Sequence, residues 1–263
     1  MKHTHRDPLE LTVNTEKIVC DGLKRKYESF HISPIWKAND YQLENPNLHW
    51  CAISTTMTGC NLRCYFCSTT PHRDYPEKYG RFFTPQEATS EIIRLLDRYK
   101  NILCVDFSGG ECLIGKEHLL KVLNILFYEK RIKQVTGVLT NGIILGNDKS
   151  YVKALSTYPN PQFYVRIGLK AGTSEGLEQR CGAYGKYYEL PFKAIKYCLD
   201  YRIKTVVFAM TDARIMPEQE RKILLENVRE IDSSIRVQEE RFYPYPDAVE
   251  RVKESLGVTS ECT

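Results

Sequence analysis

The sequence has no long apolar run, no low-complexity segment and no tandem repeat. A membrane-spanning helix requires about 20 predominantly apolar residues, so the chain is not expected to span a membrane. Its first residues, 1–8, are polar and lack the apolar stretch of a secretory signal. These absences favour a protein of the cytoplasm.

An excess of charge of one sign is also lacking, because 37 basic and 33 acidic residues give a net charge of only +4. Proteins that follow a phosphate backbone usually carry a concentrated basic stripe. The basic groups within residues 24–26 and 130–133 are interpreted as solvated surface. The charge therefore does not require nucleic acid as a partner, although it does not exclude one.

The remaining composition is that of an ordinary globular protein, with 42% apolar and 27% charged residues. A chain of 263 residues can bury one large core, and α/β barrels of this size commonly form a single domain. The ten cysteines favour a reducing compartment, where thiols stay available to a metal.

Three of the cysteines lie close together, in the run Gly59-Cys60-Asn61-Leu62-Arg63-Cys64-Tyr65-Phe66-Cys67. Iron–sulfur clusters are normally held by four thiolates, so three in one loop leave one iron of a four-iron cluster open. Zinc with His72 as fourth ligand is the alternative, although zinc sites usually contain a second close pair of ligands. No such pair follows, because the other cysteines are scattered singly: Cys20, Cys51, Cys104, Cys112, Cys181, Cys198 and Cys262.

Periodic apolar patterns divide the rest of the chain into alternating strands and helices. Strands are predicted at residues 52–57, 102–107, 135–139, 164–169, 205–208 and 235–238. The capping box Thr84-Pro85-Gln86-Glu87 predicts a helix that ends at about residue 99. Further helices are predicted at residues 116–129, 152–155, 190–199, 217–231 and 247–256. Residues 1–48, which include Pro34 and Pro46, are predicted to form an irregular N-terminal extension before a domain of residues 49–263.

This alternation predicts parallel strands with right-handed crossovers, hence an open barrel or a doubly wound sheet. Polar or glycine-rich residues follow five of the predicted strands, and the active sites of α/β barrels gather at this end of the strands. We therefore predict an α/β fold with a partial (β/α)6 TIM-type barrel. The five segments are the cysteine loop, Ser108-Gly109-Gly110-Glu111, Thr140-Asn141-Gly142, Lys170 and Thr211-Asp212.

The C-x3-C-x2-C spacing, with the aromatic residue Phe66 before the third cysteine, resembles the radical S-adenosylmethionine (radical SAM) enzymes. The resemblance implies that Cys60, Cys64 and Cys67 hold three irons of a 4Fe–4S cluster. It also implies that the open iron binds the amino and carboxylate groups of S-adenosylmethionine.

The segment Ser108-Gly109-Gly110-Glu111 resembles the part of these enzymes that holds the amino group of S-adenosylmethionine. Glycines allow the backbone to approach a ligand closely, and Glu111 offers a carboxylate acceptor to a cationic amine. Cys112 stands where many members of the family have proline.

Two further segments resemble the glycyl-radical-enzyme activases within this family. Thr140-Asn141-Gly142 resembles a strand end that flanks the cofactor, although Asn-Gly is also a common turn. Gly168-Leu169-Lys170 resembles the activases' D-L-K segment, whose lysine meets the carboxylate of S-adenosylmethionine, but Gly168 replaces the aspartate. Arg166, on the same strand face, is an alternative cation for this carboxylate or simply a member of an ion pair.

The resemblance implies an enzyme in which a reduced cluster cleaves S-adenosylmethionine to a 5'-deoxyadenosyl radical, which abstracts hydrogen from a substrate. It also implies an electron donor such as flavodoxin or ferredoxin. Chain length and the T-N-G and L-K segments favour a glycyl-radical-enzyme activase, whose substrate is a partner protein. The alternatives are an enzyme that modifies a small molecule, a peptide or an RNA base, and a non-catalytic iron–sulfur electron-transfer module.

Two cysteines and one aromatic segment leave more than one interpretation open. Cys112 and Cys181 are either reactive thiols near the site or small buried side chains, and the second role is commoner for free cysteine. The aromatic residues within 242–246 form either a lip over the site or a cover at the opposite end of the barrel.

Overall fold

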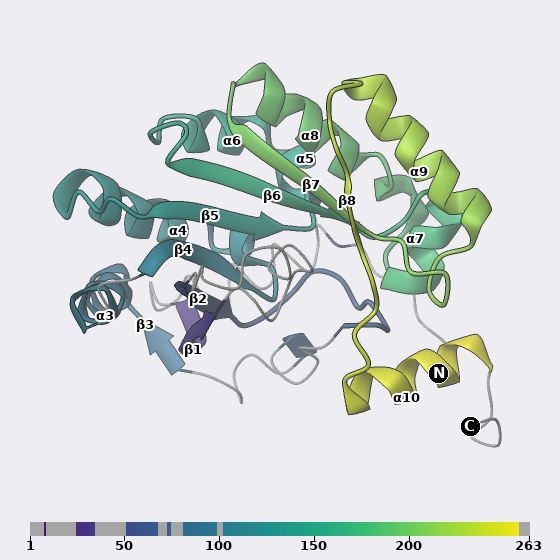
Figure 1. Ribbon diagram of the computed structural model, residues 1–263, viewed down its shortest axis with the longest axis horizontal. Helices are drawn as coiled ribbons and strands as arrows, with labels where there is room; N and C mark the ends of the chain where they lie inside the picture. The colour runs from purple at the N-terminus through teal and green to yellow at the C-terminus, as the bar shows by residue number, and fades with distance from the viewer. Residues whose placement is uncertain are drawn as a thin grey trace.

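The computed structural model describes residues 8, 25–34, 51–67, 73–74, 81–98 and 102–257. In these ranges the chain forms one sheet with the strand order β3-β1-β2-β4-β5-β6-β7-β8 (Figure 1). The strands are β1 Arg25–Pro34, β2 Cys51–Met57, β3 Arg81–Phe83, β4 Ile102–Gly109, β5 Val135–Thr140, β6 Phe163–Leu169, β7 Lys204–Met210 and β8 Gln238–Glu240.

Six of these strands, β2 and β4 to β8, pair in parallel in the order in which they follow one another along the chain. Helices lie in the crossovers between them, as right-handed βαβ connections require. The structure therefore confirms the predicted α/β fold with an open, partial TIM-type barrel. The helices are α3 Pro85–Arg98, α4 Lys116–Asn124, α5 Ile143–Asn147, α6 Lys149–Leu155, α7 Ser174–Cys181, α8 Leu190–Asp200, α9 Glu218–Ile231 and α10 Pro246–Leu256.

Strand β1 corrects the prediction that residues 1–48 are irregular. It pairs antiparallel with β2 along one edge of the parallel sheet, and β3 pairs antiparallel with β1. The aromatic and β-branched residues of this segment suit a strand, and the pairing covers an edge that would otherwise expose unpaired backbone groups. The rest of residues 1–48, apart from Pro8, lies outside the described residues.

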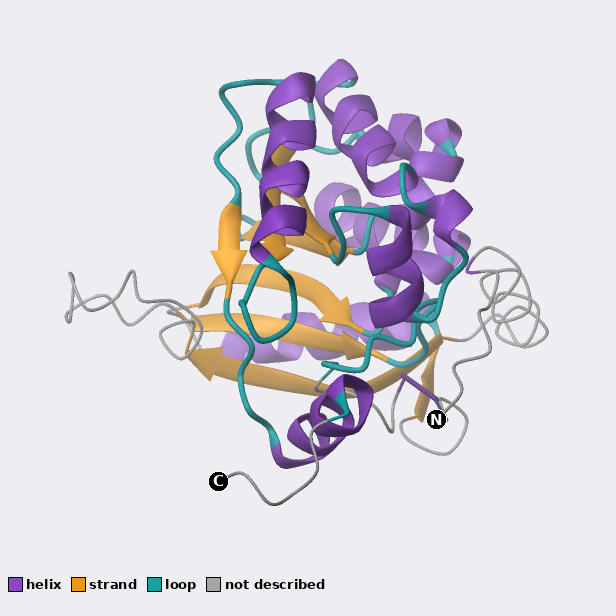
Figure 2. Ribbon diagram, turned by 90° about the vertical axis from the view of Figure 1, so that its right-hand side faces the viewer, coloured by secondary structure: helices purple, strands orange, loops and turns teal. Residues whose placement is uncertain are grey.

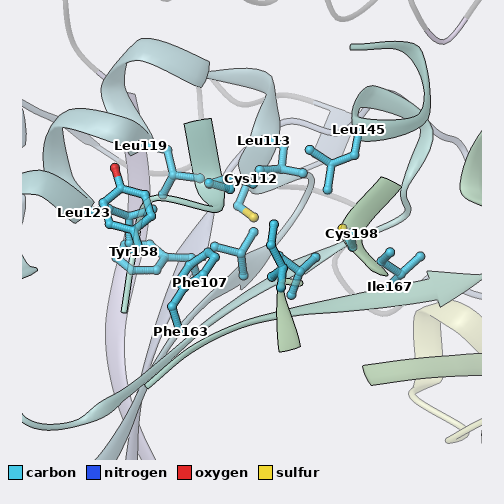
Figure 3. Close-up of a cluster of buried hydrophobic side chains, with 14 of the residues drawn as sticks. Phe107, Cys112, Leu113, Leu119, Leu123, Leu145, Tyr158, Phe163, Ile167 and Cys198 are labelled. Carbon is cyan, nitrogen blue, oxygen red and sulfur yellow. The ribbon is translucent and has the colours of Figure 1, made fainter. Parts of the chain in front are cut away.

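The main core lies between the sheet and the helices that surround it. Figure 3 shows Phe107 of the sheet on the side of Leu119 and Leu123 of α4, and Ile167 of the sheet beside Cys198 of α8. All five side chains are fully buried. Because side chains alternate across a strand, every second residue of β4 and β6 faces this core and the residues between them face away from the helices. We call the face away from the helices the inner face; it carries Ser54, Asp106, Tyr164, Arg166 and Phe208.

The helices mostly follow the predicted boundaries. The capping box at the start of α3 is confirmed, because Glu87 N donates to Thr84 Oγ1 at 3.2 Å and Thr84 N donates to Glu87 Oε2 at 2.6 Å. The helix predicted at 116–129 is α4 followed by a π-helical turn, Ile125–Glu129. Helices α5 and α7 were missed; Thr173 caps α7 by accepting from Gly176 N at 3.0 Å.

The last predicted strand, at residues 235–238, is wrong in position. Strand β8 begins at Gln238, where its parallel register with Phe208 of β7 begins. Ile235 and Val237 instead pack, partly buried, against the core on the helix side. The alternation of these apolar side chains resembles a strand, although the strand itself begins after them in the sequence.

Helix α10 lies apart from the other helices, beside the loop that follows β2 (Figures 1 and 2). Within the described residues, no helix is long and apolar enough to cross a membrane.

Candidate functional site

The cysteine loop, residues 58–67, follows β2 at the carboxyl end of the sheet. Its backbone is hydrogen-bonded to the end of α7, where Arg63 N donates to Cys181 O at 2.8 Å and Tyr65 N donates to Arg180 O at 3.1 Å. Cys64 is buried, and Cys60 and Cys67 are half-buried. The three cysteines of the motif thus lie in a loop fixed to the protein on one side.

Arginine side chains donate hydrogen bonds to the backbone carbonyl groups of this loop. Arg63 donates to Cys60 O at 2.6 Å, and Arg73 donates to Cys64 O at 2.8 Å. Arg251 of α10 donates to Tyr65 O at 3.1 Å and to Cys67 O. These guanidinium groups place positive charge around the thiols, which favours an anionic thiolate-bound cluster.

An apolar cluster joins the loop to the end of the chain. It contains Tyr65 and Phe66 of the loop, Phe242 from the connection after β8, and Ala248 and Val252 of α10. Phe66 is 8% exposed and meets the Tyr65 ring edge-on, with centroids 5.7 Å apart. The aromatic segment 242–246 therefore begins beside the cysteine loop, and not at the opposite end of the barrel.

The glycines after β4 allow close contact between this strand end and the cysteine loop. Gly110 N donates to Met57 O at 2.7 Å, and Glu111 N donates to Gly59 O at 2.8 Å. A Cβ at Gly110 would lie 1.9 Å from Gly59 O, so no larger residue fits without displacing the backbone. The sequence predicted that these glycines allow the backbone to approach a ligand closely. In the structure, the group that they approach is the backbone of the cysteine loop.

Glu111 connects the ends of β4 and β5. Its side chain is 1% exposed; Oε1 accepts from Leu113 N at 3.2 Å, and Oε2 accepts from Asn141 N at 2.8 Å. Thr140, the preceding residue, accepts from Gly142 N at 3.0 Å. A carboxylate offers about four acceptor positions in all, so a carboxylate such as Glu111 can accept from an ammonium group as well as from backbone amides.

Asn141 extends this network to the cysteine loop, and its contacts fix the orientation of Asn61. Ile143 N donates to Asn141 Oδ1 at 3.1 Å, so Asn141 Nδ2 is the atom that donates to Asn61 Oδ1, at 2.7 Å. Because Oδ1 of Asn61 accepts this hydrogen bond, Nδ2 is the other polar atom of its side chain. This atom is buried and has no hydrogen-bond partner among the described residues.

Lys170 and Arg166 lie against the same aromatic ring. Arg166 stacks over Phe208 at 4.4 Å and pairs with Glu240 at 3.2 Å; Lys170 lies 5.2 Å from the Phe208 centroid. A Cβ at Gly168 would lie 2.6 Å from Phe208 Cζ and 3.0 Å from Lys170 Nζ. The position that carries aspartate in the activases therefore has its space filled by the ring and the ammonium group.

A narrow pocket, part of it open to solvent, lies between these segments. Leu62 of the cysteine loop, Asn141 after β5, Lys170 after β6 and Tyr188 line it. It thus joins three of the five segments that the sequence placed at one end of the barrel.

The pKa values of two thiols of the loop, those of Cys60 and Cys64, are raised in the cluster-free chain. Burial raises the pKa of Cys60 to about 12, with a further contribution from the Glu111 carboxylate. The pKa of Cys64 is raised chiefly by its hydrogen bond to Cys181, whose Sγ lies 3.5 Å away, and also by burial. Binding of iron must therefore displace protons from these thiols.

The donor set of the loop suits a 4Fe–4S cluster, because three free cysteines supply its thiolate ligands. No three Cys, His, Asp or Glu side chains in the described ranges converge on one ion position. In a 4Fe–4S cluster each thiolate binds a different iron, so the cysteine Sγ atoms do not need to meet at one point. The unpaired donor of Asn61 also suits a group rich in sulfur acceptors. His72, the fourth ligand in the zinc alternative, lies outside the described residues.

Cys112 is fully buried in the main core, where its thiol donates to Leu139 O at 3.2 Å. Cys181 is also fully buried, against Cys64. Both thiols pack in the interior, as free cysteines usually do.

Several groups that shape the site were not identified from the sequence. Asn61 lies inside the cysteine motif, and only this position in the sequence indicated that it belongs to the site. Arg73 and Arg251 gave no signal, because their partners are backbone carbonyls of a distant loop.

Comparison with known proteins agrees with this geometry. The family model of the radical SAM superfamily matches residues 54–228, well over half of the chain. The chain therefore belongs to the radical SAM superfamily, whose members are enzymes that use a 4Fe–4S cluster and S-adenosylmethionine. No curated protein matches the sequence.

Solved structures share the fold at low sequence identity. SuiB of Streptococcus suis, bound to S-adenosylmethionine, is 18% identical with a TM-score of 0.54 over 76% of this chain and 45% of SuiB. TYW1 with a lysine–pyruvate adduct is 14% identical, with a TM-score of 0.56 over 94% and 89% of the two chains. QueE from Escherichia coli is 13% identical, with a TM-score of 0.50 over 91% and 92%. The chain thus spans under half the length of SuiB.

Proposed function

We propose that this chain cleaves S-adenosylmethionine reductively and uses the resulting 5'-deoxyadenosyl radical to abstract hydrogen from a substrate. The network Glu111–Asn141–Asn61 carries the proposal, because it joins the ends of β4 and β5 to the cysteine loop. A loop that only carried a cluster for electron transfer would not require these strand ends to converge on it.

Each group of residues has its own role in this proposal. Cys60, Cys64 and Cys67 hold three irons, and Phe66 of the same loop packs in the apolar cluster with α10. When bound, the cluster supplies one electron to the sulfonium of S-adenosylmethionine.

The strand ends hold the rest of the cofactor. Glu111 accepts from its amino group, supported by the backbone of Ser108, Gly109 and Gly110. Asn141 borders the pocket, and Thr140 directly precedes Asn141 in the chain. Lys170 balances its carboxylate, because it makes no ion pair within the described residues. Arg166 is the weaker candidate for this role, since Glu240 already pairs with it.

We further propose that the substrate is a small molecule, a peptide or an RNA base bound at the inner face of the sheet. Polar side chains on that face, among them Asp106, Tyr164 and Arg166, support a bound polar substrate. The filled space at Gly168 counts against an activase, although the T-N-G and L-K segments keep that role as the second candidate. A glycyl radical signal in the electron paramagnetic resonance (EPR) spectrum of a co-expressed partner would distinguish an activase. Flavodoxin or ferredoxin is the proposed reductant in either case.

The test is anaerobic reconstitution with iron and sulfide, followed by dithionite and S-adenosylmethionine. We expect 5'-deoxyadenosine, detected by mass-resolved chromatography. Cys64→Ala should abolish both the cluster and the product, whereas Cys198→Ala, in the core, should retain both. Turnover by Cys64→Ala with a full cluster would remove the loop from the mechanism.

Glu111 is tested by Glu111→Gln, which retains one acceptor oxygen but removes the charge. We expect the brown absorbance of the cluster to remain and the affinity for S-adenosylmethionine to fall about tenfold or more, as for a lost charged hydrogen bond. Unchanged affinity would exclude Glu111 from the cofactor site. A wild-type protein with a full cluster that forms no 5'-deoxyadenosine would overturn the proposed function itself.

A further inference from the structure

Asp106 is a carboxylate in the middle of the sheet that no described Lys or Arg side chain pairs with. It lies on β4, aligned with Gly137 of β5 and Tyr164 of β6. Its neighbours Val105 and Phe107 are fully buried on the helix side, so Asp106 faces the inner side. Within the described part of the chain, it forms no ion pair.

Two neutral donors hold one oxygen of this carboxylate. Tyr164 Oη donates to Asp106 Oδ1 at 2.6 Å, and Cys104 Sγ donates to it at 3.1 Å. Burial, together with the charge of Asp106, raises the pKa of Tyr164 and of Cys104, so both stay protonated donors. Neither donor neutralises the charge, and Oδ2 has no hydrogen bond to the described residues.

Gly137 makes this arrangement possible. A Cβ there would lie 2.3 Å from Tyr164 Cζ and 2.4 Å from Asp106 Oδ1. Glycine inside a strand is unfavourable relative to alanine, because it loses more backbone freedom on folding. At Gly137, a side chain would collide with both the carboxylate and the phenol.

The carboxylate lies below the cofactor residues on the same face. Ser108 is two residues closer to the carboxyl end of β4, which corresponds to about 7 Å along the strand. Its hydroxyl contacts that of Ser54 at 3.0 Å. On β6, Arg166 Nε is buried and has no partner in the described ranges. The inner face therefore offers unsatisfied polar groups both at Asp106 and between it and the cofactor site.

We infer that Asp106 binds a protonated amine of the substrate, with Tyr164 and Cys104 orienting the carboxylate. This inference rests on the proposed function, because it assigns a substrate class to the same site. A charged nitrogen complements a half-buried carboxylate through a charge-assisted hydrogen bond, which also fixes the rest of the molecule below the cofactor.

The test compares two probes of equal shape, n-pentylamine and 1-pentanol, titrated calorimetrically into the reconstituted full chain with S-adenosylmethionine. We expect the amine to bind about tenfold or more tightly than the alcohol. Asp106→Asn keeps an acceptor for Tyr164 and should remove this preference. Asp200→Asn, the same charge change on the exposed end of α8, should keep it.

Equal binding of the two probes by the wild type would overturn the inference. So would an Asp106→Asn variant that keeps the preference and only melts at a lower temperature, since Asp106 would then act solely in holding the sheet. The same preparations are assayed for 5'-deoxyadenosine. Product without amine preference rejects the amine site alone, whereas no product from a full cluster rejects the proposed function.

Discussion

The amide of Asn61 is oriented by a chain of hydrogen bonds that starts at a backbone donor, Ile143 N. Its Nδ2, which has no hydrogen-bond partner among the described residues, is buried in the residue next to Cys60, whose Sγ lies 3.9 Å from Asn61 Oδ1. A buried donor without a partner is unfavourable unless a ligand satisfies it. Hydrogen bonds to the sulfur atoms of a cluster are one means by which a protein sets its reduction potential.

We predict that Asn61→Ala lowers the midpoint potential of the cluster, because an N–H donor to sulfur stabilises the more negative reduced state. The free energy of unfolding should also fall by about 1–2 kcal/mol, since Asn141 Nδ2 loses its acceptor. An EPR-monitored redox titration measures the potential. Asn124→Ala, at the end of α4, serves as control; a potential unchanged in Asn61→Ala would show that the donor does not reach the cluster.

At the scale of elements, a buried ion pair fixes α7, whose end holds the cysteine loop, against α9. Arg180 and Glu220 have side chains only 4% and 10% exposed, and Glu220 also accepts from Gly172 N at 2.7 Å. A Cβ at Gly172 or Gly176 would collide with Glu220, so both glycines are needed for this packing.

Arg180→Met is expected to lower the free energy of unfolding by about 3–5 kcal/mol, because it leaves a buried charge unpaired. Urea denaturation measures the effect. Adding Glu220→Gln should recover part of the loss, as a double-mutant cycle would reveal. Lys193→Ala breaks the exposed pair with Glu189 and should change stability by less than about 1 kcal/mol. Equal losses of stability in Arg180→Met and Lys193→Ala would contradict the buried role of Arg180.

The loop after β7 provides a pH-dependent contact. Hydrogen bonds from the Arg214 side chain, and then from the backbone amides of Arg214 and Phe242, hold the pKa of Asp212 below its usual range, although burial opposes them. The contact with Phe242 N, at 2.9 Å, fixes the segment that packs on the cysteine loop.

Because the pKa of Asp212 is lower in the folded state, its stabilisation is complete above the unfolded pKa of about 3.9 and is lost as the pH falls toward the folded value. Asp212→Asn should therefore cost about 1–2 kcal/mol at pH 7, after allowance for the exposed Arg214. The difference from wild type should be unchanged at pH 5 and shrink below pH 4. Urea denaturation at these values measures it, and a difference that grows on acidification would refute the assignment.

For the whole molecule, the parallel strands and the end of the barrel that carries the site could be predicted from sequence, because their signals are local. The capping box at Thr84 and the glycines after β4 are examples. Features set by distant contacts could not be predicted. The register of β8 depends on its pairing with β7, and the position of β1 depends on the edge of β2. The residue that accepts from Arg251, Tyr65, lies 186 residues earlier in the chain.

Helix α10 illustrates this limit and leads to a prediction about the whole chain. Its apolar face covers Tyr65 and Phe66, while Arg251 donates to the carbonyls of Tyr65 and Cys67. The last helix therefore closes over the loop that follows the first parallel strand. Since water and oxidants must reach the thiolates from outside the protein, this cover should govern how long a bound cluster survives in air.

We predict that Arg251→Ala shortens the lifetime of the cluster in air several-fold, measured as the decay of its visible absorbance. Unfolding should become easier by only about 1–2 kcal/mol, because the helix keeps its apolar contacts. Glu254→Ala, an exposed position on the same helix, should leave the lifetime unchanged. If both variants decay like the wild type, then α10 covers the loop without protecting it, and the protection must come from the sheet side.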